Sequence, residues 1–191
     1  MKAVIYTKTG GLEVIKQQSA EMSVPDDDQV LVEVKACALN IGDYQRFQTK
    51  NGKIPISTYI TNKMMGYIGK PLGAEIAGIV TKKGKNVTHV KTGDAVFGKT
   101  AGTAPVGGIA EYAVMDADRV CLKPDNFSFE EAAAVSISFD TALGAVRKAD
   151  ITNGQRVMIY GASGGVGLFA VQLAKIAGAE VTGVCSTRNI E

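Results

Sequence analysis

Histidine and cysteine are scarce in this chain, and their scarcity limits its metal and disulfide chemistry. The only histidine is His89, and the three cysteines, Cys37, Cys121 and Cys185, include no CxxC pair. A catalytic zinc needs three protein ligands drawn from histidine, cysteine and carboxylates, and a disulfide framework needs paired cysteines. The composition therefore argues against a disulfide scaffold and offers little for a metal centre. It favours a reducing, cytoplasmic location.

An excess of one charge and long apolar runs are also missing. The 191 residues carry a formal net charge of +2. A nucleic-acid binder would show a basic stripe with interleaved aromatics, and a membrane-spanning helix needs about twenty apolar residues. We therefore expect neither nucleic acid nor a membrane as a partner. Hydrophobic residues, at 46%, are sufficient for a globular core.

The N-terminal part, from Met1 to about Pro124, has the pattern of short strands separated by turns. β-branched residues alternate or cluster between turn signals. Val30, Val32 and Val34, for example, fall on one face of a predicted strand. The spacing predicts a β-rich antiparallel domain, a barrel or a sandwich, over residues 1–124.

After Pro124 the pattern changes to helices and buried strands. Ser128 and Glu131 form a predicted capping box at the start of one helix, and "DTALGAVRKAD" predicts a second helix. The short apolar strand "RVMIY" is followed by an amphipathic helix that ends at Gly178, and then by a strand in "EVTGVCS". Residues 125–191 are therefore predicted to contain linking helices and one βαβ unit.

A glycine-rich turn joins the strand and the helix of that unit. It consists of Gly161, Ala162, Ser163, Gly164, Gly165, Val166 and Gly167. Ala162, Gly164 and Gly167 occupy the positions of the GxGxxG fingerprint, where small residues let a pyrophosphate approach the backbone and let the helix pack on the sheet. The helix start presents free N–H groups to the phosphates. The motif predicts a dinucleotide-binding turn; the alternative is a tight turn that binds no ligand.

The residues after the second strand distinguish the two nicotinamide cofactors. Units that prefer NAD place an acidic residue about twenty positions beyond the glycines. Here Ser186, Thr187 and Arg188 occupy that region, and no carboxylate follows until Glu191. Hydroxyls and a guanidinium suit a 2′-phosphate, so we predict NADP(H) as the cofactor. The alternative is that Arg188 is a solvent-facing loop residue.

Six segments together resemble the medium-chain dehydrogenase/reductase superfamily. They are "LNIGDYQRF", "LGAEIAGIV", "TGDAVFG", "GGIAEYAVMDADRVCLKPDNFSFEEAAAV", "FDTALGAV" and "VMIYGASGGVGLFAVQLAKIAGAEVTGVCSTRN". The resemblance is best to the zinc-free, quinone-oxidoreductase-like branch and covers essentially the whole chain. It implies an α/β protein. A GroES-like β-barrel-type catalytic domain over residues 1–124 is followed by an incomplete Rossmann domain, a doubly wound parallel sheet, over 125–191.

Two positions support the zinc-free branch. Where zinc-dependent relatives have a cysteine and a histidine, this sequence has Asn40 and Ala74, and the four-cysteine lobe for a structural zinc is absent. Neither residue belongs to the usual set of zinc ligands, so no metal site is expected. Cys37 is interpreted as a small apolar residue, and His89 as a surface or packed strand residue.

The resemblance also implies roles near the nicotinamide. Asn40 and Asp43 would line the nicotinamide end of the cleft, with Asn40 donating a hydrogen bond to substrate or cofactor and Asp43 fixing the local backbone. Tyr44 is a wall of the site or a proton donor, or else a packed aromatic residue. Thr141 faces the nicotinamide or the pyrophosphate, or else satisfies its own helical turn. Glu75 is interpreted as structural.

The implied reaction is hydride transfer from NADPH to a quinone or another activated carbonyl or alkene, without a metal. Such an acceptor stabilises the incoming charge through its own electronics, so a Lewis acid is not required. Tyr59, Met64, Met65 and Tyr67 form an apolar lip over the acceptor, or else a loop that covers the end of the barrel. The alternative function is a catalytically inactive fragment or a non-enzymatic scaffold.

The end of the chain also affects the interpretation. A dinucleotide-binding fold has two βαβαβ halves, whereas this chain ends after a single βαβ unit. We therefore interpret it as a truncated form of the enzyme, with a bare sheet edge and apolar surface at the first strand of that unit. We expect the protein to form a homo-oligomer, a dimer.

Overall fold

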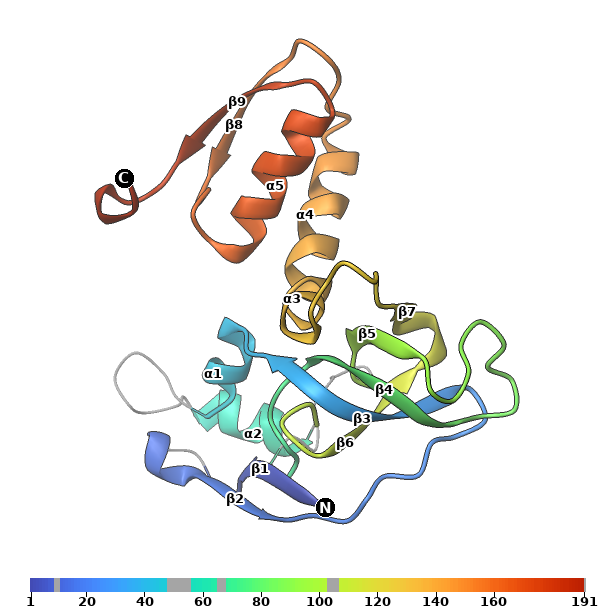
Figure 1. The fold of residues 1–191 in the computed structure, drawn as a ribbon. Coiled ribbons are helices and arrows are strands. Elements are labelled where there is room, and N and C mark those ends of the chain that lie inside the picture. The colour runs from blue at the N-terminus through green and yellow to red at the C-terminus, as the bar shows by residue number, and fades with distance from the viewer. Residues whose placement is uncertain (9–10, 48–55, 65–67, 103–106, 191) are drawn as a thin grey trace. The chain divides into compact units, whose positions relative to one another are not determined.

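The computed structural model describes residues 1–8, 11–47, 56–64, 68–102 and 107–190. These form two compact units, Met1–Ala134 and Val135–Glu191 (Figure 1). The first unit extends past Pro124 because helix α3 (Phe129–Ala133) packs on its sheet, where Ala132 and Ala133 share a buried cluster with Ala77.

The first unit is built on a five-stranded antiparallel sheet in the order β6-β3-β4-β5-β7. Its strands are β3 (Gln29–Ala38), β4 (Glu75–Lys83), β5 (Ala95–Lys99), β6 (Tyr112–Asp116) and β7 (Val120–Leu122). A separate antiparallel pair consists of β1 (Lys2–Tyr6) and β2 (Ile15–Ser19). The remaining helices of the unit are η1 (Leu12–Val14), α1 (Ile41–Phe47), α2 (Ile56–Met64) and η2 (Ala117–Arg119). The predicted β-rich N-terminal domain is confirmed.

The main core of the first unit is aliphatic. Val30 and Val32 of β3 are fully buried, and Val34 packs against the same cluster, as their alternation predicts. Leu31, on the opposite face, is also buried, so β3 is covered on both faces at this point. The other buried members of the cluster are Ile76, Val80, Val87, Val90, Val96, Ala113, Met115 and Val120. Removing each large side chain of this kind from water contributes roughly 1.5–3 kcal/mol.

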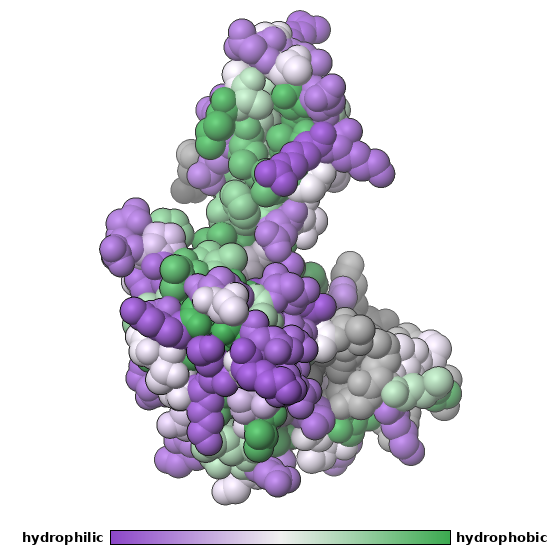
Figure 2. All heavy atoms as spheres, turned by 90° about the vertical axis from the view of Figure 1, so that its right-hand side faces the viewer, coloured by the Kyte–Doolittle hydropathy of each residue, from purple (hydrophilic) through white to green (hydrophobic). Residues whose placement is uncertain are grey.

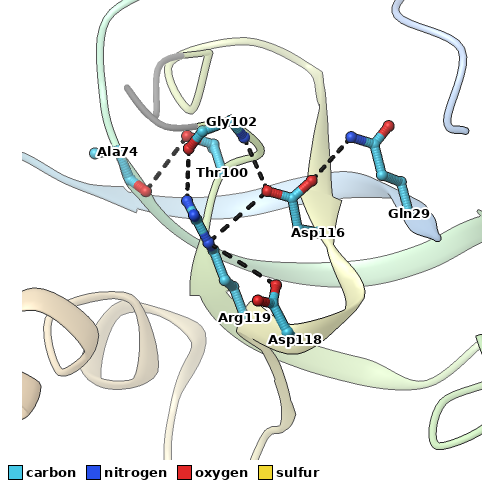
Figure 3. Close-up of polar contacts among 7 residues, drawn as sticks. All are labelled: Gln29, Ala74, Thr100, Gly102, Asp116, Asp118 and Arg119. Carbon is cyan, nitrogen blue, oxygen red and sulfur yellow. Dashed lines mark hydrogen bonds and ion pairs between the residues drawn. The ribbon is translucent and has the colours of Figure 1, made fainter.

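A polar network joins three segments of the first unit at the end of β6 (Figure 3). Asp116 accepts hydrogen bonds from Gln29 Nε2 and from the Gly102 amide, both at 2.9 Å. Arg119 Nη1 donates to the Gly102 carbonyl at 2.6 Å. Both backbone polar groups of Gly102 are therefore paired, and the segment after β5 is tied to β3 and η2.

The second unit is a βαβ unit preceded by a helix. Its elements are α4 (Ser136–Lys148), β8 (Arg156–Tyr160), α5 (Gly165–Ile176), β9 (Glu180–Val184) and η3 (Thr187–Asn189). β8 and β9 pair in parallel. α4 packs on α5, where Phe139 and Phe169 meet edge to face with ring centroids 5.7 Å apart. The predicted strand, helix and strand are confirmed.

The helices of both units are short, and two of their predicted ends are confirmed. Ser128 Oγ accepts from the Glu131 amide at 3.1 Å, while the Glu131 carboxylate accepts from the Ser128 amide at 2.8 Å. Gly178 follows α5 with a φ of +87°, a left-handed conformation that glycine adopts without strain. None of the described helices has both the length and the apolar character of a membrane span.

One face of β8 is exposed in the second unit. Met158 is 72% exposed and Tyr160 88%, whereas Val157 and Ile159 between them are half-buried, because alternate residues of a strand point to opposite faces. Figure 2 shows hydrophobic residues at the surface of this unit. The exposed apolar surface predicted at this strand is therefore present.

Candidate functional site

The first candidate site lies where β3 ends and α1 begins. The Asn40 carbonyl accepts from the Asp43 amide at 3.0 Å. The Asp43 carboxylate reaches back: Oδ2 accepts from the Asn40 amide at 3.0 Å, and Oδ1 accepts from the Gly73 amide at 3.2 Å. The contact from Asp43 to the Asn40 amide is the half of a capping box that the N3 side chain makes. Together these contacts fix the backbone of Asn40 relative to the segment that leads into β4; the place of Asp43 in a nicotinamide cleft stays a prediction.

The side chain of Asn40 contacts a second buried carboxylate. Its Nδ2 donates a hydrogen bond to Oε2 of Glu75, the first residue of β4, which is 1% exposed. The amide group from which we expect a hydrogen bond to substrate or cofactor is therefore already engaged. A second amide hydrogen and the carbonyl oxygen remain on Asn40, so its role toward a ligand stays a prediction.

Cys37 lies beside these carboxylates. Burial, and then the negative charges of Asp43 and Glu75, raise the pKa of its thiol to about 12. The thiol is therefore neutral at physiological pH and a poor nucleophile. Glycine is required next to it, because a Cβ on Gly73 would lie 2.4 Å from Cys37 Sγ, and a Cβ on Gly108 would lie 2.8 Å from it. Cys37 packs against the main core, as a small apolar residue would.

An apolar pocket of about 310 Å³ opens beside Asn40. It is lined by Val4, Leu12, Ile15, Leu39, Asn40, Asp43, Tyr44, Leu72 and Ile109. The structure thus brings Asn40, Asp43 and Tyr44 to one pocket whose other walls are aliphatic, a composition suited to a small apolar ligand. A wider hollow of about 440 Å³ beside β2 contains none of the predicted site residues.

Sequence reasoning missed the aliphatic walls of this pocket. They come from β1, η1 and β2, and from the segments after β3, before β4 and before β6. Each is an ordinary apolar residue in its own segment, and no local pattern links the segments. Tyr44 lines the pocket and is 39% exposed, which favours a wall position over a packed core position; its role as a proton donor stays a prediction.

The second candidate site is the glycine-rich turn between β8 and α5. The amides of Gly161 and Ala162 donate to the Val184 carbonyl at 2.8 and 3.0 Å, which holds the turn against the end of β9. Because the N-cap residue of α5, Gly164, has no side chain, it cannot cap the first amides of the helix, and these remain available to a ligand. The exposed residues of the turn are Gly161, Ser163, Gly164, Gly165 and Val166.

Two glycines of the turn differ in how much space surrounds them. A Cβ on Gly167 would lie 2.1 Å from the Gly161 carbonyl oxygen and 2.8 Å from Ala162 Cα, so the close packing of α5 on the turn excludes a side chain there. A Cβ on Gly164 would lie 3.4 Å from the Gly161 oxygen, an ordinary contact. The fold itself tolerates a side chain at Gly164, and its absence leaves room for a ligand.

The loop after β9 contacts the glycine-rich turn. Ser186, Thr187 and Arg188 are exposed, and the next residue, Asn189, donates from Nδ2 to Ser163 Oγ at 2.8 Å. The structure therefore brings the predicted pyrophosphate and 2′-phosphate segments together. Asn189 was missed because no sequence signal indicates that it pairs with a residue of the turn.

Two other predicted positions have less support from contacts. Thr141 is exposed on α4, and its hydroxyl donates to the Ile137 carbonyl at 2.7 Å, which is the alternative in which it satisfies its own helical turn. Its contact with a nicotinamide stays a prediction. Of the predicted apolar lip, Met64 is 82% exposed, while the side chain of Tyr59 and all of Met65 and Tyr67 lie outside the described residues.

Metal-ligating side chains do not gather in the described part of the chain. Among these residues, no three histidine, cysteine, aspartate or glutamate side chains lie close enough to hold a metal ion. His89 is exposed, with Nε2 3.3 Å from the Val120 carbonyl oxygen. This position agrees with its interpretation as a surface residue.

Known protein sequences are similar to this chain over essentially its whole length. A family model described as the alcohol dehydrogenase GroES-like domain matches residues 26–125. The chain is 38% identical to a quinone oxidoreductase of Sus scrofa, over 98% of this chain and 53% of that protein. It is 36% identical to a 2-methylene-furan-3-one reductase of Solanum lycopersicum, over 100% of this chain and 49% of that protein. The chain spans about half the length of the curated relatives it matches.

Solved structures share the fold. The quinone oxidoreductase from Coxiella burnetii aligns with a TM-score of 0.86 at 30% identity, over 99% of this chain and 57% of that chain. The Escherichia coli quinone oxidoreductase in complex with NADPH aligns with a TM-score of 0.77 at 30% identity, over 98% of this chain and 54% of that chain. These alignments confirm the predicted α/β fold class with a GroES-like N-terminal domain.

Proposed function

Because the chain belongs to the quinone-oxidoreductase-like branch of the medium-chain dehydrogenase/reductase superfamily, we propose that it is part of an NADPH-dependent oxidoreductase. The proposed reaction transfers a hydride to a quinone or to another activated carbonyl or alkene. The observation that carries the proposal is the pocket at the end of β3, where Asn40, Asp43 and Tyr44 meet aliphatic walls. The two relatives, a quinone oxidoreductase and a methylene-furanone reductase, support the same class of reaction.

The glycine-rich turn and the loop after β9 form the proposed NADP(H) site. When bound, NADPH supplies the hydride. The first amides of α5 bind the pyrophosphate, and the missing side chain of Gly164 leaves it room. Ser186, Thr187 and Arg188 bind the 2′-phosphate through hydroxyls and a guanidinium. The related Escherichia coli enzyme, solved with NADPH, supports this choice of cofactor.

The proposed acceptor site gives each polar residue a different task. Asp43 holds the loop, since its carboxylate already accepts from two backbone amides. Asn40 orients the acceptor by a hydrogen bond, and Tyr44 forms part of the wall. The aliphatic residues exclude water and hold an apolar ring in place. Thr141 is the proposed contact to the nicotinamide or the pyrophosphate.

The proposed reaction needs no metal. A quinone or enone delocalises the negative charge that a hydride brings, so a Lewis acid is not required. Asn40 and Ala74, at the positions where zinc-dependent relatives have ligands, support this part of the proposal. Metal analysis should find no stoichiometric zinc, and treatment with a chelator should leave the rate unchanged. A rate that falls with the chelator and returns with zinc would contradict it.

The test is a reduction assay on the protein as its source makes it, followed by the loss of NADPH absorbance. We expect turnover of 1,4-benzoquinone and but-3-en-2-one with NADPH, slower turnover with NADH, and none of butan-2-one, which has no activated double bond. Asn40→Ala should lower the rate, and Asn126→Ala, an exposed residue in another loop, should not. NADPH binding without reduction of any acceptor would contradict the reaction. A protein that binds no NADPH would support the non-enzymatic scaffold instead.

Two further properties, a homodimer and a cytoplasmic location, stay predictions for the whole protein. Light scattering during size-exclusion chromatography tests the first, and fractionation of the source cells tests the second. A monomer by light scattering would contradict the dimer. Recovery only with membranes or outside the cell would contradict the location.

A further inference from the structure

Asn40 is held by two buried carboxylates that contact different parts of it. Asp43, 4% exposed, accepts from the Asn40 backbone amide at 3.0 Å, whereas Glu75, 1% exposed, accepts from the side-chain Nδ2. A buried carboxylate is costly unless hydrogen bonds satisfy it, so each contact also stabilises the fold. The function proposed above uses Asn40 and Asp43 but gives no task to Glu75.

The position of Glu75 is set by the sheet and not by the loop that carries Asn40. Glu75 pairs with Ala38 of β3 and with Lys99 of β5, so it has a strand on either side. Residues directly opposite each other on antiparallel strands have neighbouring Cβ atoms on one face, so Lys99 brings a positive residue to the face of Glu75. Because the two neighbouring strands fix the backbone of Glu75, its carboxylate can hold the Asn40 side chain in one position.

The chemistry of the two side chains selects one orientation of the Asn40 amide. An ionised carboxylate only accepts hydrogen bonds, whereas a carboxamide has donor hydrogens at one end and a carbonyl oxygen at the other. Reversing the Asn40 amide would bring its Oδ1 against an oxygen of Glu75 and place two acceptors together. While it is ionised, Glu75 therefore excludes the reversed amide and leaves the second Nδ2 hydrogen of Asn40 to donate to the carbonyl oxygen of the acceptor.

We propose that Glu75 is a positioning residue of the acceptor site: by holding Nδ2 of Asn40, it keeps the Asn40 amide in the orientation in which the acceptor binds. The inference rests on the proposed function, because it takes the pocket beside Asn40 as the acceptor site. Glu75 is not among the described residues that line this pocket, so it acts through Asn40 without touching the acceptor.

A reciprocal exchange of the two residues tests the pairing. In Asn40→Asp two carboxylates face each other, and the KM for 1,4-benzoquinone should rise roughly a hundredfold. In Glu75→Gln two amides face each other without a defined orientation, and the KM should rise roughly tenfold. In the double variant the glutamine amide donates to the aspartate, which restores the pairing but leaves position 40 without an N–H for the acceptor carbonyl. Its KM should therefore stay at or below that of Asn40→Asp alone, well below the product of the two single losses.

The readouts separate positioning from a purely structural role. In Glu75→Gln the NADPH Kd and kcat should stay within about twofold of the wild type, because the lost contact affects acceptor binding. Glu33→Gln is the matched control, since Glu33 lies on neighbouring β3 in a surface ion pair with Lys35 at 2.6 Å. A wild-type KM in Glu75→Gln would overturn the inference. So would a double variant whose loss equals the product of the two single losses.

A binding measurement separates this inference from the proposed reaction. The side-chain NH2 resonances of Asn40 are followed by NMR in 15N-asparagine-labelled protein while cyclohexanone, a ketone with no double bond to reduce, is added. We expect a shift in the wild type and in Glu33→Gln, and the same shift in Glu75→Gln only at roughly tenfold higher cyclohexanone. If the wild type reduces no quinone or enone but shows this pattern, the reaction is refuted and the positioning is supported. No shift in the wild type, or equal shifts in the wild type and Glu75→Gln at the same cyclohexanone concentration, would overturn the inference.

Discussion

Replacing Gly167 with alanine would put a methyl group into space that the backbone already occupies. The added Cβ would lie 2.1 Å from the Gly161 carbonyl oxygen and 2.8 Å from both the Gly161 carbonyl carbon and Ala162 Cα. Favourable contacts of such atoms begin near about 3.5 Å, so the start of α5 must move away from the turn by roughly 1 Å or more. Backbone atoms cannot rotate aside as the end of a side chain can.

The expected loss of stability follows from this overlap. Overpacking of this kind costs roughly 1–3 kcal/mol, and alanine within a helix recovers up to about 1 kcal/mol relative to glycine. We therefore expect Gly167→Ala to lower the free energy of unfolding of the second unit by roughly 1–2 kcal/mol, a change of about 5- to 30-fold in its folded to unfolded ratio. Gly144→Ala on α4, where a Cβ meets nothing within 4 Å, controls for helix propensity.

Gly164→Ala should have the opposite profile. Gly164 has a φ of −84°, which alanine adopts without strain, and its Cβ would make only an ordinary 3.4 Å contact. The free energy of unfolding should therefore change by less than about 0.5 kcal/mol. The same methyl group fills the space proposed for the pyrophosphate, so NADPH should bind roughly 10- to 100-fold more weakly.

Both variants can be measured on the same preparations, by urea unfolding followed by circular dichroism and by titration with NADPH followed by fluorescence. If Gly167→Ala were as stable as Gly144→Ala, the close approach of α5 to the turn would be refuted. If Gly164→Ala bound NADPH as tightly as the wild type, the room at Gly164 would have no connection with the cofactor.

Three further predictions address other contacts. Asn189→Ala removes the hydrogen bond to Ser163 and should weaken NADPH binding by roughly threefold to tenfold without changing the acceptor KM; unchanged NADPH affinity in a titration would refute a role for this contact. The pKa of the Cys37 thiol is raised from 9.0 to about 12 in the folded chain. Its contribution to stability is therefore complete below pH 9.0 and is lost as the pH rises toward 12, because the unfolded thiol ionises first. Between pH 9.0 and about 12, the urea midpoint should fall less steeply with pH in Cys37→Ala than in the wild type. Parallel curves for the two proteins would contradict the raised pKa of the thiol. Ser128→Ala removes the capping box with Glu131 and should cost about 1 kcal/mol of the stability of the first unit, most of which Ser128→Asp should restore; equal urea midpoints for Ser128→Ala and the wild type would contradict it.

The elements of the second unit could be predicted because their signals are local. β8 is a short apolar run, and α5 begins at a glycine turn and stops just before Gly178, close to where the pattern predicts. The capping box of Ser128 and Glu131 likewise depends on two residues three positions apart. The limit of the first unit was harder to predict, because α3 joins it through packing of Ala132 and Ala133 on the sheet.

The candidate site could be predicted only where its residues are neighbours in sequence. Asn40, Asp43 and Tyr44 lie within five consecutive positions at the start of α1, so their spacing in the sequence is enough to place them together. Glu75 was interpreted as structural, because nothing near it in the sequence indicates that its carboxylate meets the Asn40 amide. The hydrogen bond from the Thr141 hydroxyl to the Ile137 carbonyl could be predicted, because both residues belong to the same helix and the contact does not depend on where that helix packs.

The sequence by itself determines the β-rich first unit, the βαβ unit and the need for small residues in its turn, because each depends on residues close together in the chain. Tertiary structure alone decides that Glu75 meets Asn40, that Asn189 meets Ser163, and that separate aliphatic segments enclose one pocket. The two contacts join residues 35 and 26 positions apart. Which residues meet across such separations depends on strand register and on the packing of one element against another, and local propensity carries no information about either.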